Sequence, residues 1–224
     1  MLEEFFDKIF IPLFRFHEYK RGDVGVALPP VITDSETEEV KNMLLFAKEC
    51  GVREVLISNI SQIKIIEDFD FSVMGDFRLN VTNSLTKTEY EKMGIESVIL
   101  SPELTLPMAR DIGGSVIVYG RIPLMLTERC FIKDNFGCDK CSNASLTDRT
   151  GAKFPMIREY EHRNVILNST PTYMGDKAEE LRSARLFSHH FIFTTESAKE
   201  ISEILTAYKN KRPLQSSVRR MGKR

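Results

Sequence analysis

Three cysteines lie close together in the middle of the chain. Cys130, Cys138 and Cys141 occur in the run CFIKDNFGCDKC, and only two residues separate the last pair. A Cys-x-x-Cys pair on a turn lets two thiolates converge on one ion, and Gly137 just before it supplies a flexible backbone. In a reducing compartment, three thiols at this spacing favour a metal ion or a metal cluster over disulfides. The segment therefore predicts a metal-binding site.

A tetrahedral site needs a fourth ligand, and His162 is better placed for it than Cys50. His162 follows the cysteines after one extended segment, and three Cys with one His form a normal structural zinc set. An iron–sulfur cluster is the alternative cofactor. Cys50 ends a predicted helix, at the opposite end of the βα units from Cys130, so we expect it to be a buried small hydrophobe. The plainer alternative is that all these thiols are simply packed and that His162 is a surface histidine.

Short apolar runs alternate with amphipathic runs and indicate the elements that position these side chains. Such alternation is typical of parallel strands joined by helical crossovers. We therefore expect an α/β fold, a partial TIM-like (βα) barrel with about five or six parallel strands. The predicted strands are 23–30, 53–58, 76–81, 96–101 and 115–120, and the predicted helices are 35–50, 61–69, 85–94 and 102–113. Ser35 and Glu38 predict a capping box at the start of the first helix.

The pattern changes after Gly120. We expect residues 1–120 to form the partial barrel and residues 121–175 to form the cysteine-rich segment, in which 154–169 reads as two extended runs. Residues 176–209 predict a helix, a strand and a final helix capped by Ser197 and Glu200. Residues 210–224 are basic, contain no acid and predict a flexible tail.

Polar residues that follow the predicted strands are the remaining candidates for chemistry, because parallel α/β folds gather their sites at the carboxyl ends of strands. Glu103 could also be a helix N-terminal charge, and Arg121 could be a salt-bridge partner. The hydrolase and nucleotide motifs H-E-x-x-H, G-x-S-x-G, G-x-G-x-x-G and the P-loop are absent from the sequence. The predicted catalytic residues are Glu103, Arg121 and Glu128, and the predicted substrate-binding residues are Asn80, Asn83, Ser101 and Tyr119.

The composition excludes several classes of protein. The 224 residues are 42% hydrophobic and carry 31 Lys and Arg against 32 Asp and Glu, which fits a globular chain rather than a basic nucleic-acid coat or a disordered chain. No apolar run reaches the ~18 residues that a membrane span needs. The first residues show no secretory signal, so we expect a cytoplasmic protein. Contact with RNA through the basic tail stays open.

Several stretches resemble peptidase family U32, the collagenase-like peptidases. The resemblance implies a βα barrel followed by a cysteine-bearing segment, and a peptidase with a peptide or protein substrate. Other family members resemble iron–sulfur proteins that support oxygen-independent hydroxylation of tRNA, rRNA or quinone precursors, which gives an alternative function. The matching stretches are GDFRLNVTNSLT (75–86), VILSPELTL (98–106), VYGRIPLMLTERC (118–130), FGCDKC (136–141), DRTGAKFPMI (148–157) and ILNSTPTYM (166–174).

The chain departs from the family pattern in two ways. The family has a fourth cysteine where this chain has His162, which favours zinc over an iron–sulfur cluster. The N-terminal half of the family's barrel is not visible, so the chain resembles the C-terminal portion of a longer member. A second alternative function follows from this, a non-enzymatic half-domain that completes the barrel of a partner chain.

Overall fold

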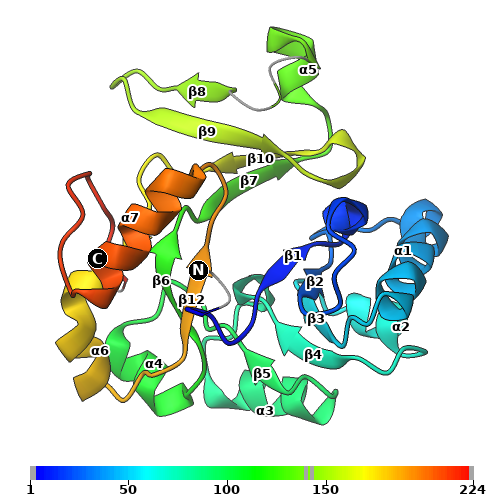
Figure 1. Ribbon diagram of the computed structural model, residues 1–224, viewed down its shortest axis with the longest axis horizontal. Helices are drawn as coiled ribbons and strands as arrows, with labels where there is room; N and C mark the ends of the chain where they lie inside the picture. The colour runs from blue at the N-terminus through cyan, green and yellow to red at the C-terminus, as the bar shows by residue number, and fades with distance from the viewer. Residues whose placement is uncertain (1–3, 139–140, 142–143, 222–224) are drawn as a thin grey trace. The chain divides into compact units, whose positions relative to one another are not determined.

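A computed structural model describes residues 4–138, 141 and 144–221 of the chain (Figure 1). The chain divides into two compact units. The first unit is Met1–Ser101 with Asp111–Gly114, and the second unit is Pro102–Arg110 with Ser115–Arg224.

The first unit is built on a parallel sheet of five strands that pair in chain order. This arrangement confirms the α/β class and the parallel pairing, while a closed barrel is not confirmed. Helices α1 and α2 contact each other beside the sheet (Figure 1). The strands are β1 (Phe10–Pro12), β2 (Gly25–Ala27), β3 (Glu54–Ile57), β4 (Ser72–Gly75) and β5 (Ser97–Val98), and the helices are α1 (Thr37–Glu49), α2 (Gln62–Ile66) and α3 (Ser84–Lys92).

Two local predictions for the first unit are wrong. Residues 76–81 do not form a strand, because the Asp76 carboxylate accepts the Arg78 N–H at 3.1 Å and caps a 3₁₀ turn at Phe77–Leu79. The strand is β4, which ends just before this turn. The capping box before α1 is Thr33 with Glu36 rather than Ser35 with Glu38, because a 3₁₀ turn precedes the α-helix.

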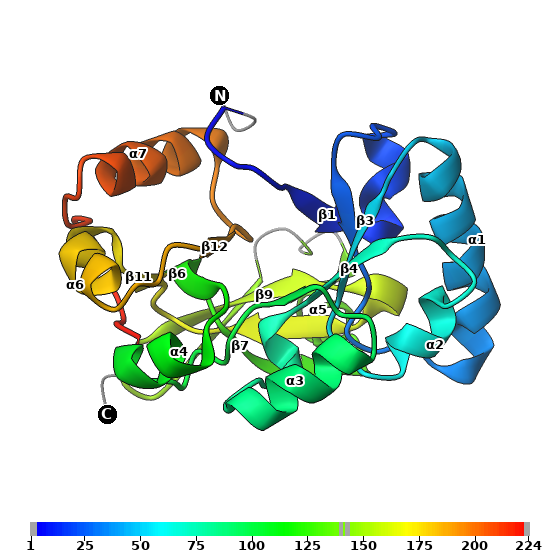
Figure 2. The same cartoon turned by 90° about the horizontal axis from the view of Figure 1, so that it is seen from below.

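The second unit contains a three-stranded sheet with β6 (Val116–Gly120) at its centre (Figure 2). All five residues of β6 are buried, as its continuous apolar run predicts. On one side it pairs in parallel with β12 (His189–Ile192), and on the other side it pairs antiparallel with β11 (Thr172–Tyr173). Because β6 and β12 are parallel, their carboxyl ends lie at the same end of this sheet.

A four-stranded antiparallel sheet completes the second unit. Its order is β7–β10–β9–β8, and it carries the short helix α5 (Phe131–Phe136). The hairpin of β9 and β10 confirms the two extended runs predicted in 154–169. The strands are β7 (Pro123–Thr127), β8 (Ser145–Thr147), β9 (Lys153–Arg158) and β10 (Asn164–Leu167).

The remaining described α-helices are α4 (Leu106–Ile112), α6 (Ala178–Ser183) and α7 (Ala198–Lys209). The predicted capping box of α7 is confirmed, with Ser197 and Glu200 bonded to each other's backbone N–H. Beyond α7 the chain runs back along β11, where the Arg219 N–H donates to the Pro171 carbonyl at 2.8 Å. The tail thus makes contacts at residue 219, while the flexibility predicted for residues 210–224, of which 222–224 lie outside the described residues, stays a prediction.

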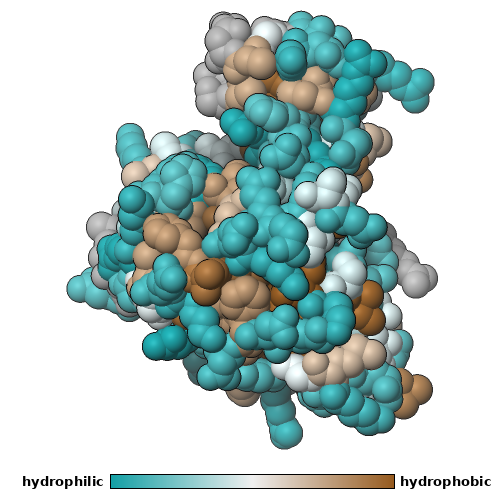
Figure 3. Space-filling view, turned by 90° about the vertical axis from the view of Figure 1, so that its right-hand side faces the viewer, coloured by the Kyte–Doolittle hydropathy of each residue, from teal (hydrophilic) through white to brown (hydrophobic). Residues whose placement is uncertain are grey.

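Polar side chains cover most of the face in Figure 3, and apolar side chains gather between them. Leu45 and Ile60, for example, are about half exposed, at 50% and 51%. Partly exposed apolar side chains are ordinary on protein surfaces. None of the described helices is long and apolar enough to cross a bilayer.

Gly120 gives a test of the tight pairing between β6 and β12. Its φ is +138°, and an added Cβ would lie 2.6 Å from the Ile192 carbonyl oxygen. Gly151 in the same unit also has positive φ, at +84°, but its Cβ would meet nothing within 4 Å. We expect Gly151→Ala to lower the free energy of unfolding by about 1–2 kcal/mol through backbone strain alone. Gly120→Ala should cost at least about 2 kcal/mol more, because two strands must separate.

Urea denaturation of both variants measures the two costs side by side. Equal costs for Gly120→Ala and Gly151→Ala would show that β12 does not press against Gly120.

Candidate functional site

The structure divides the predicted site residues between the two units. In the first unit, the Asn83 side chain caps α3 by accepting the Thr86 N–H at 2.9 Å. Asn80 ends a 3₁₀ turn with φ of +52°, and Ser101 is 1% exposed with its N–H bonded to the Val81 carbonyl. Each of these polar groups has a local structural role, and a role in substrate binding stays a prediction.

Tyr119 and Arg121 lie in the second unit at the carboxyl end of β6. The Tyr119 hydroxyl donates to Glu196 Oε1 at 2.8 Å, and Glu196 lies in the loop between β12 and α7. The other carboxylate oxygen, Oε2, accepts the N–H groups of Thr194 and Thr195 at 2.7 and 3.0 Å. Glu196 is only partly buried, so the pair joins a buried phenol to a carboxylate that solvent reaches.

Arg121 follows β6 directly and is held by backbone carbonyls. Its Nη1 donates to the carbonyl oxygens of Asn168 and Ser169, the first at 2.9 Å. Within the described part of the chain, its buried Nε has no hydrogen-bond partner. A guanidinium carries five N–H donors, so Arg121 keeps capacity to bind a carbonyl or carboxylate oxygen.

The surroundings of the Tyr119 hydroxyl at the end of β6 keep it neutral. Burial, the Glu196 charge and the hydrogen bond to Glu196 all raise the pKa of Tyr119, and the Arg121 charge opposes them. The hydrogen bonds from Ser197 hold the pKa of Glu200 below its ordinary value, with a further contribution from Arg121. The charges of Arg121, Glu196 and Glu200 thus all act on the Tyr119 hydroxyl. We call Tyr119, Arg121 and Glu196 the strand-end site.

The predicted catalytic residues Glu103 and Glu128 do not share this arrangement. Glu103 is exposed. Glu128 binds Arg163 through both oxygens, at 2.6 and 2.9 Å. The Arg163 side chain is 2% exposed whereas that of Glu128 is 72% exposed, so Glu128 neutralises a buried cation from the surface.

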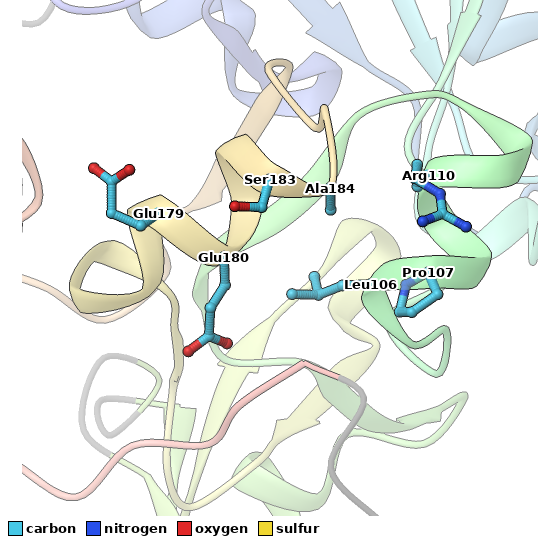
Figure 4. A pocket seen from close by; sticks show the side chains of 7 residues that line it. All are labelled: Leu106, Pro107, Arg110, Glu179, Glu180, Ser183 and Ala184. Atoms are coloured by element: carbon cyan, nitrogen blue, oxygen red, sulfur yellow. The ribbon is translucent and has the colours of Figure 1, made fainter.

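A hollow in the second unit lies between α4 and α6 (Figure 4). One of its acids, Glu179, forms an ion pair with Lys211. None of the predicted site residues lines the hollow, so it provides no support for the strand-end site. Its lining residues are Leu106, Pro107, Arg110, Glu179, Glu180, Ser183 and Ala184.

Cys130 lies at the start of α5 and accepts two N–H groups. The Lys133 main-chain N–H lies 3.4 Å from its Sγ, and the Asn164 Nδ2 lies 3.7 Å from it. N–H contacts of this kind orient a sulfur that binds a metal. Cys130 and Cys141 both pack on a small core centred on Ile132. That core therefore brings two of the three predicted cysteine ligands to one region.

Asn164 also connects this region to His162. The Asn164 side chain is fully buried, accepts the Ile132 N–H at 3.1 Å, and donates to the His162 carbonyl at 3.4 Å as well as to Cys130. His162 itself has φ of +62°, a conformation that a non-glycine residue holds only when its surroundings require it.

The complete ligand set is not tested by these contacts. Cys138 is exposed, and its N-terminal neighbours are described, but residues 139–140 of the Cys-x-x-Cys turn lie outside the described residues. Within 4–138, 141 and 144–221, no group of three or more His, Cys, Asp and Glu side chains is arranged to hold a metal ion. The zinc set and its iron–sulfur alternative therefore stay predictions. Cys50 is only partly buried, less than expected.

The sequence reasoning missed Glu196. It stands one residue before the capping box of α7, where an acid normally reads as a partner of the helix dipole. The available signal was its position after a predicted strand, the same criterion that selected Tyr119 and Arg121.

Comparisons with known proteins place this geometry in context. A family model described as Peptidase family U32 matches residues 3–210. An uncharacterized protease of Methanocaldococcus jannaschii is 28% identical over 113 residues, which are 46% of this chain and 28% of that relative. The chain thus spans less than a third of the curated relative that it matches. No solved structure matches the chain at a significant level.

The Tyr119–Glu196 bond predicts a pH dependence of stability. The pKa of Tyr119 is raised in the folded chain above its ordinary value of 10.0, so this contribution is fully present below pH 10 and is lost as the pH rises further. We expect the stability difference between the native chain and Tyr119→Phe to be constant from pH 7 to 9. It should then shrink by up to about 1.4 kcal/mol per pH unit. Urea denaturation between pH 7 and 11 measures this, and a difference that stays flat above pH 10 would contradict it.

Proposed function

The chain belongs to peptidase family U32, and from that membership we propose that it hydrolyses peptide bonds in peptide or protein substrates. The single observation that carries this proposal is the family match over residues 3–210. The strand-end site supplies the groups that such a reaction needs. We also propose a cytoplasmic location, in keeping with the free cysteines.

Glu196 is the group proposed to activate water. An ionised carboxylate offers about four acceptor positions, and the phenol and two backbone N–H groups occupy three of them. The remaining position can accept a proton from a water molecule that attacks the peptide carbonyl carbon. The same carboxyl then returns the proton to the leaving amine as the C–N bond breaks. Tyr119 is a positioning residue, because it orients Glu196 from the buried side.

Arg121 is the group proposed to bind the carbonyl oxygen. Its Nη1 is fixed on the Asn168 and Ser169 carbonyls, and its Nε–H is buried without a partner in the described structure, so a substrate oxygen reaches it only if the neighbouring side chains move. A fixed donor of this kind stabilises the negative charge that develops on the oxygen during attack. Glu103 and Glu128 stay candidates by sequence position alone.

We propose that the cysteine segment holds a structural zinc ion through Cys130, Cys138, Cys141 and His162. The N–H donors on the Cys130 sulfur and the Asn164 link to His162 support the proposal. When bound, the metal would crosslink the turn. The iron–sulfur cluster, the RNA-modifying function and the half-domain function stay alternatives. In the described tail, Lys211 and Arg220 already pair with Glu179 and Asp176, which reduces the charge available to RNA.

Conservative substitutions test the strand-end site. Glu196→Gln should lower kcat/KM for a fluorogenic casein substrate about 100-fold, because it removes the base. Arg121→Lys should lower it by a similar factor, since a lysine lacks the fixed fork. Glu203→Gln is the matched control, because it makes the same charge change at an exposed side chain of α7. Its kcat/KM should stay within about twofold of that of the native chain. Native rates in both Glu196→Gln and Arg121→Lys would contradict the site assignment.

Metal analysis with an absorption spectrum tests the cofactor. We expect a colourless chain with about one zinc ion, and loss of that ion on Cys130→Ser, Cys138→Ser or Cys141→Ser. Cys50→Ser is the matched control and should keep it. A brown, iron-containing protein after anaerobic purification would favour the iron–sulfur alternative.

A further inference from the structure

Residues 219–221 contact the outer edge of β11 in the second unit. Thr172 forms a parallel bridge with Arg219. The Arg219 N–H donates to the Pro171 carbonyl at 2.8 Å, and the Tyr173 N–H donates to the Arg219 carbonyl at 3.1 Å. The segment thus forms one isolated bridge, with two main-chain hydrogen bonds, on an edge whose other side pairs with β6 (Figure 2). We call residues 171–176 the β11 edge.

Side chains give this edge a preference for a basic residue. The Arg220 Nη2 donates to Asp176 Oδ2 at 2.7 Å, and its Nη1 donates to the Tyr173 carbonyl. Asp176 Oδ1 is buried and has no hydrogen-bond partner in the described part of the chain. The carboxylate therefore keeps acceptor capacity toward a second N–H of a guanidinium.

The next position takes an apolar side chain. Met221 is 8% exposed, and its N–H lies 3.4 Å from the Met174 sulfur. Leu214 and Val218 pack against the core that contains Tyr119 and Tyr173. Between these anchors, residues 215–217 and 219 are exposed. A few anchoring side chains and one bridged pair thus hold the segment on the edge.

This combination is the usual way in which proteins bind extended peptides. Main-chain hydrogen bonds to a strand edge supply affinity, and pockets for alternate side chains supply specificity. The register of the sheet pairs Tyr173 with Tyr119 and Thr172 with Gly120. A peptide on the β11 edge would therefore lie two strands from β6, whose end carries the strand-end site.

We propose that the β11 edge is a binding site for an extended peptide in which an arginine precedes a large apolar residue, and that residues 214–221 occupy it as an internal, displaceable segment. The inference deepens the proposed function and rests on it for the source of the peptide, the substrate chain. Arg220 and Met221 occupy the positions that a substrate's arginine and apolar residue would take. Displacement of the internal segment precedes binding, which makes the segment autoinhibitory.

Competition between the internal segment and an added peptide tests the proposal. The probe is a fluorescein-labelled peptide of residues 212–221, RPLQSSVRRM, and the readout is fluorescence anisotropy. In the full chain, Arg219→Pro with Arg220→Glu removes the donor to Pro171 and reverses the charge that faces Asp176. We expect this double variant to bind the peptide at least about tenfold more tightly than the native chain, whose own segment competes. Adding Asp176→Asn should weaken binding about tenfold.

A peptide that carries the Arg220→Glu change is the matched control and should bind at least about tenfold more weakly. Equal binding by the native chain and the double variant, or no binding to a double variant that keeps its circular dichroism spectrum, would overturn the proposal. The measurement needs no turnover. A chain that binds the peptide but hydrolyses nothing would contradict the proposed function and leave this site intact.

Hydrogen exchange on the native chain tests displacement without any substitution. The Arg219 N–H bonds to Pro171 on the outer edge of β11, whereas the Met174 N–H bonds to Val118 on the inner edge at 2.9 Å. We expect the Arg219 amide to exchange at least about tenfold faster than the Met174 amide, because the segment opens locally. Equal protection of the two amides would show that the segment is a fixed strand and would overturn the proposal.

Discussion

Complete burial of β6 constrains the rest of the second unit. Val116–Gly120 is apolar on both faces, so it needs a strand on either side and packed side chains above and below. β12 and β11 supply the two neighbours from distant parts of the sequence. Gly120 permits the close approach of Ile192 at the end of the strand. The polar groups therefore lie at the end of this strand, where the Tyr119 hydroxyl bonds to Glu196 and Arg121 follows Gly120.

A second constraint is the pair of buried polar residues at the start of β10. Arg163 and Asn164 are 1% and 0% exposed, and an unsatisfied polar group at such depth would be costly. Arg163 forms an ion pair with Glu128. The Asn164 side chain accepts the Ile132 N–H and donates to the Cys130 sulfur and the His162 carbonyl. The need to satisfy these two side chains thus fixes the turns on which three candidate residues lie.

The sequence predicted the elements that one local signal determines. Apolar runs located β2, β3 and β6, and the Ser197–Glu200 box located the start of α7. Competition between local signals caused the errors, since Asp76 folds its own backbone into a turn although Phe77, Leu79 and Val81 alternate as in a strand. The partners of β6 could not be predicted because strand pairing depends on distant contacts. Glu196 follows a predicted strand, but its hydrogen bond with Tyr119 became visible only when β12 was known to pair with β6.

The place of residues 219–221 on β11 has a consequence for how the molecule behaves in solution. A strand edge exposes a row of N–H and C=O groups that any other extended chain can pair with, and natural proteins cover or interrupt such edges. Here Arg219 covers the edge, and the adjacent Arg220 brings a charge to it. The same residues therefore protect the protein against edge-to-edge aggregation. A change that uncovers β11 for a bound peptide would therefore also expose the strand to pairing with other chains.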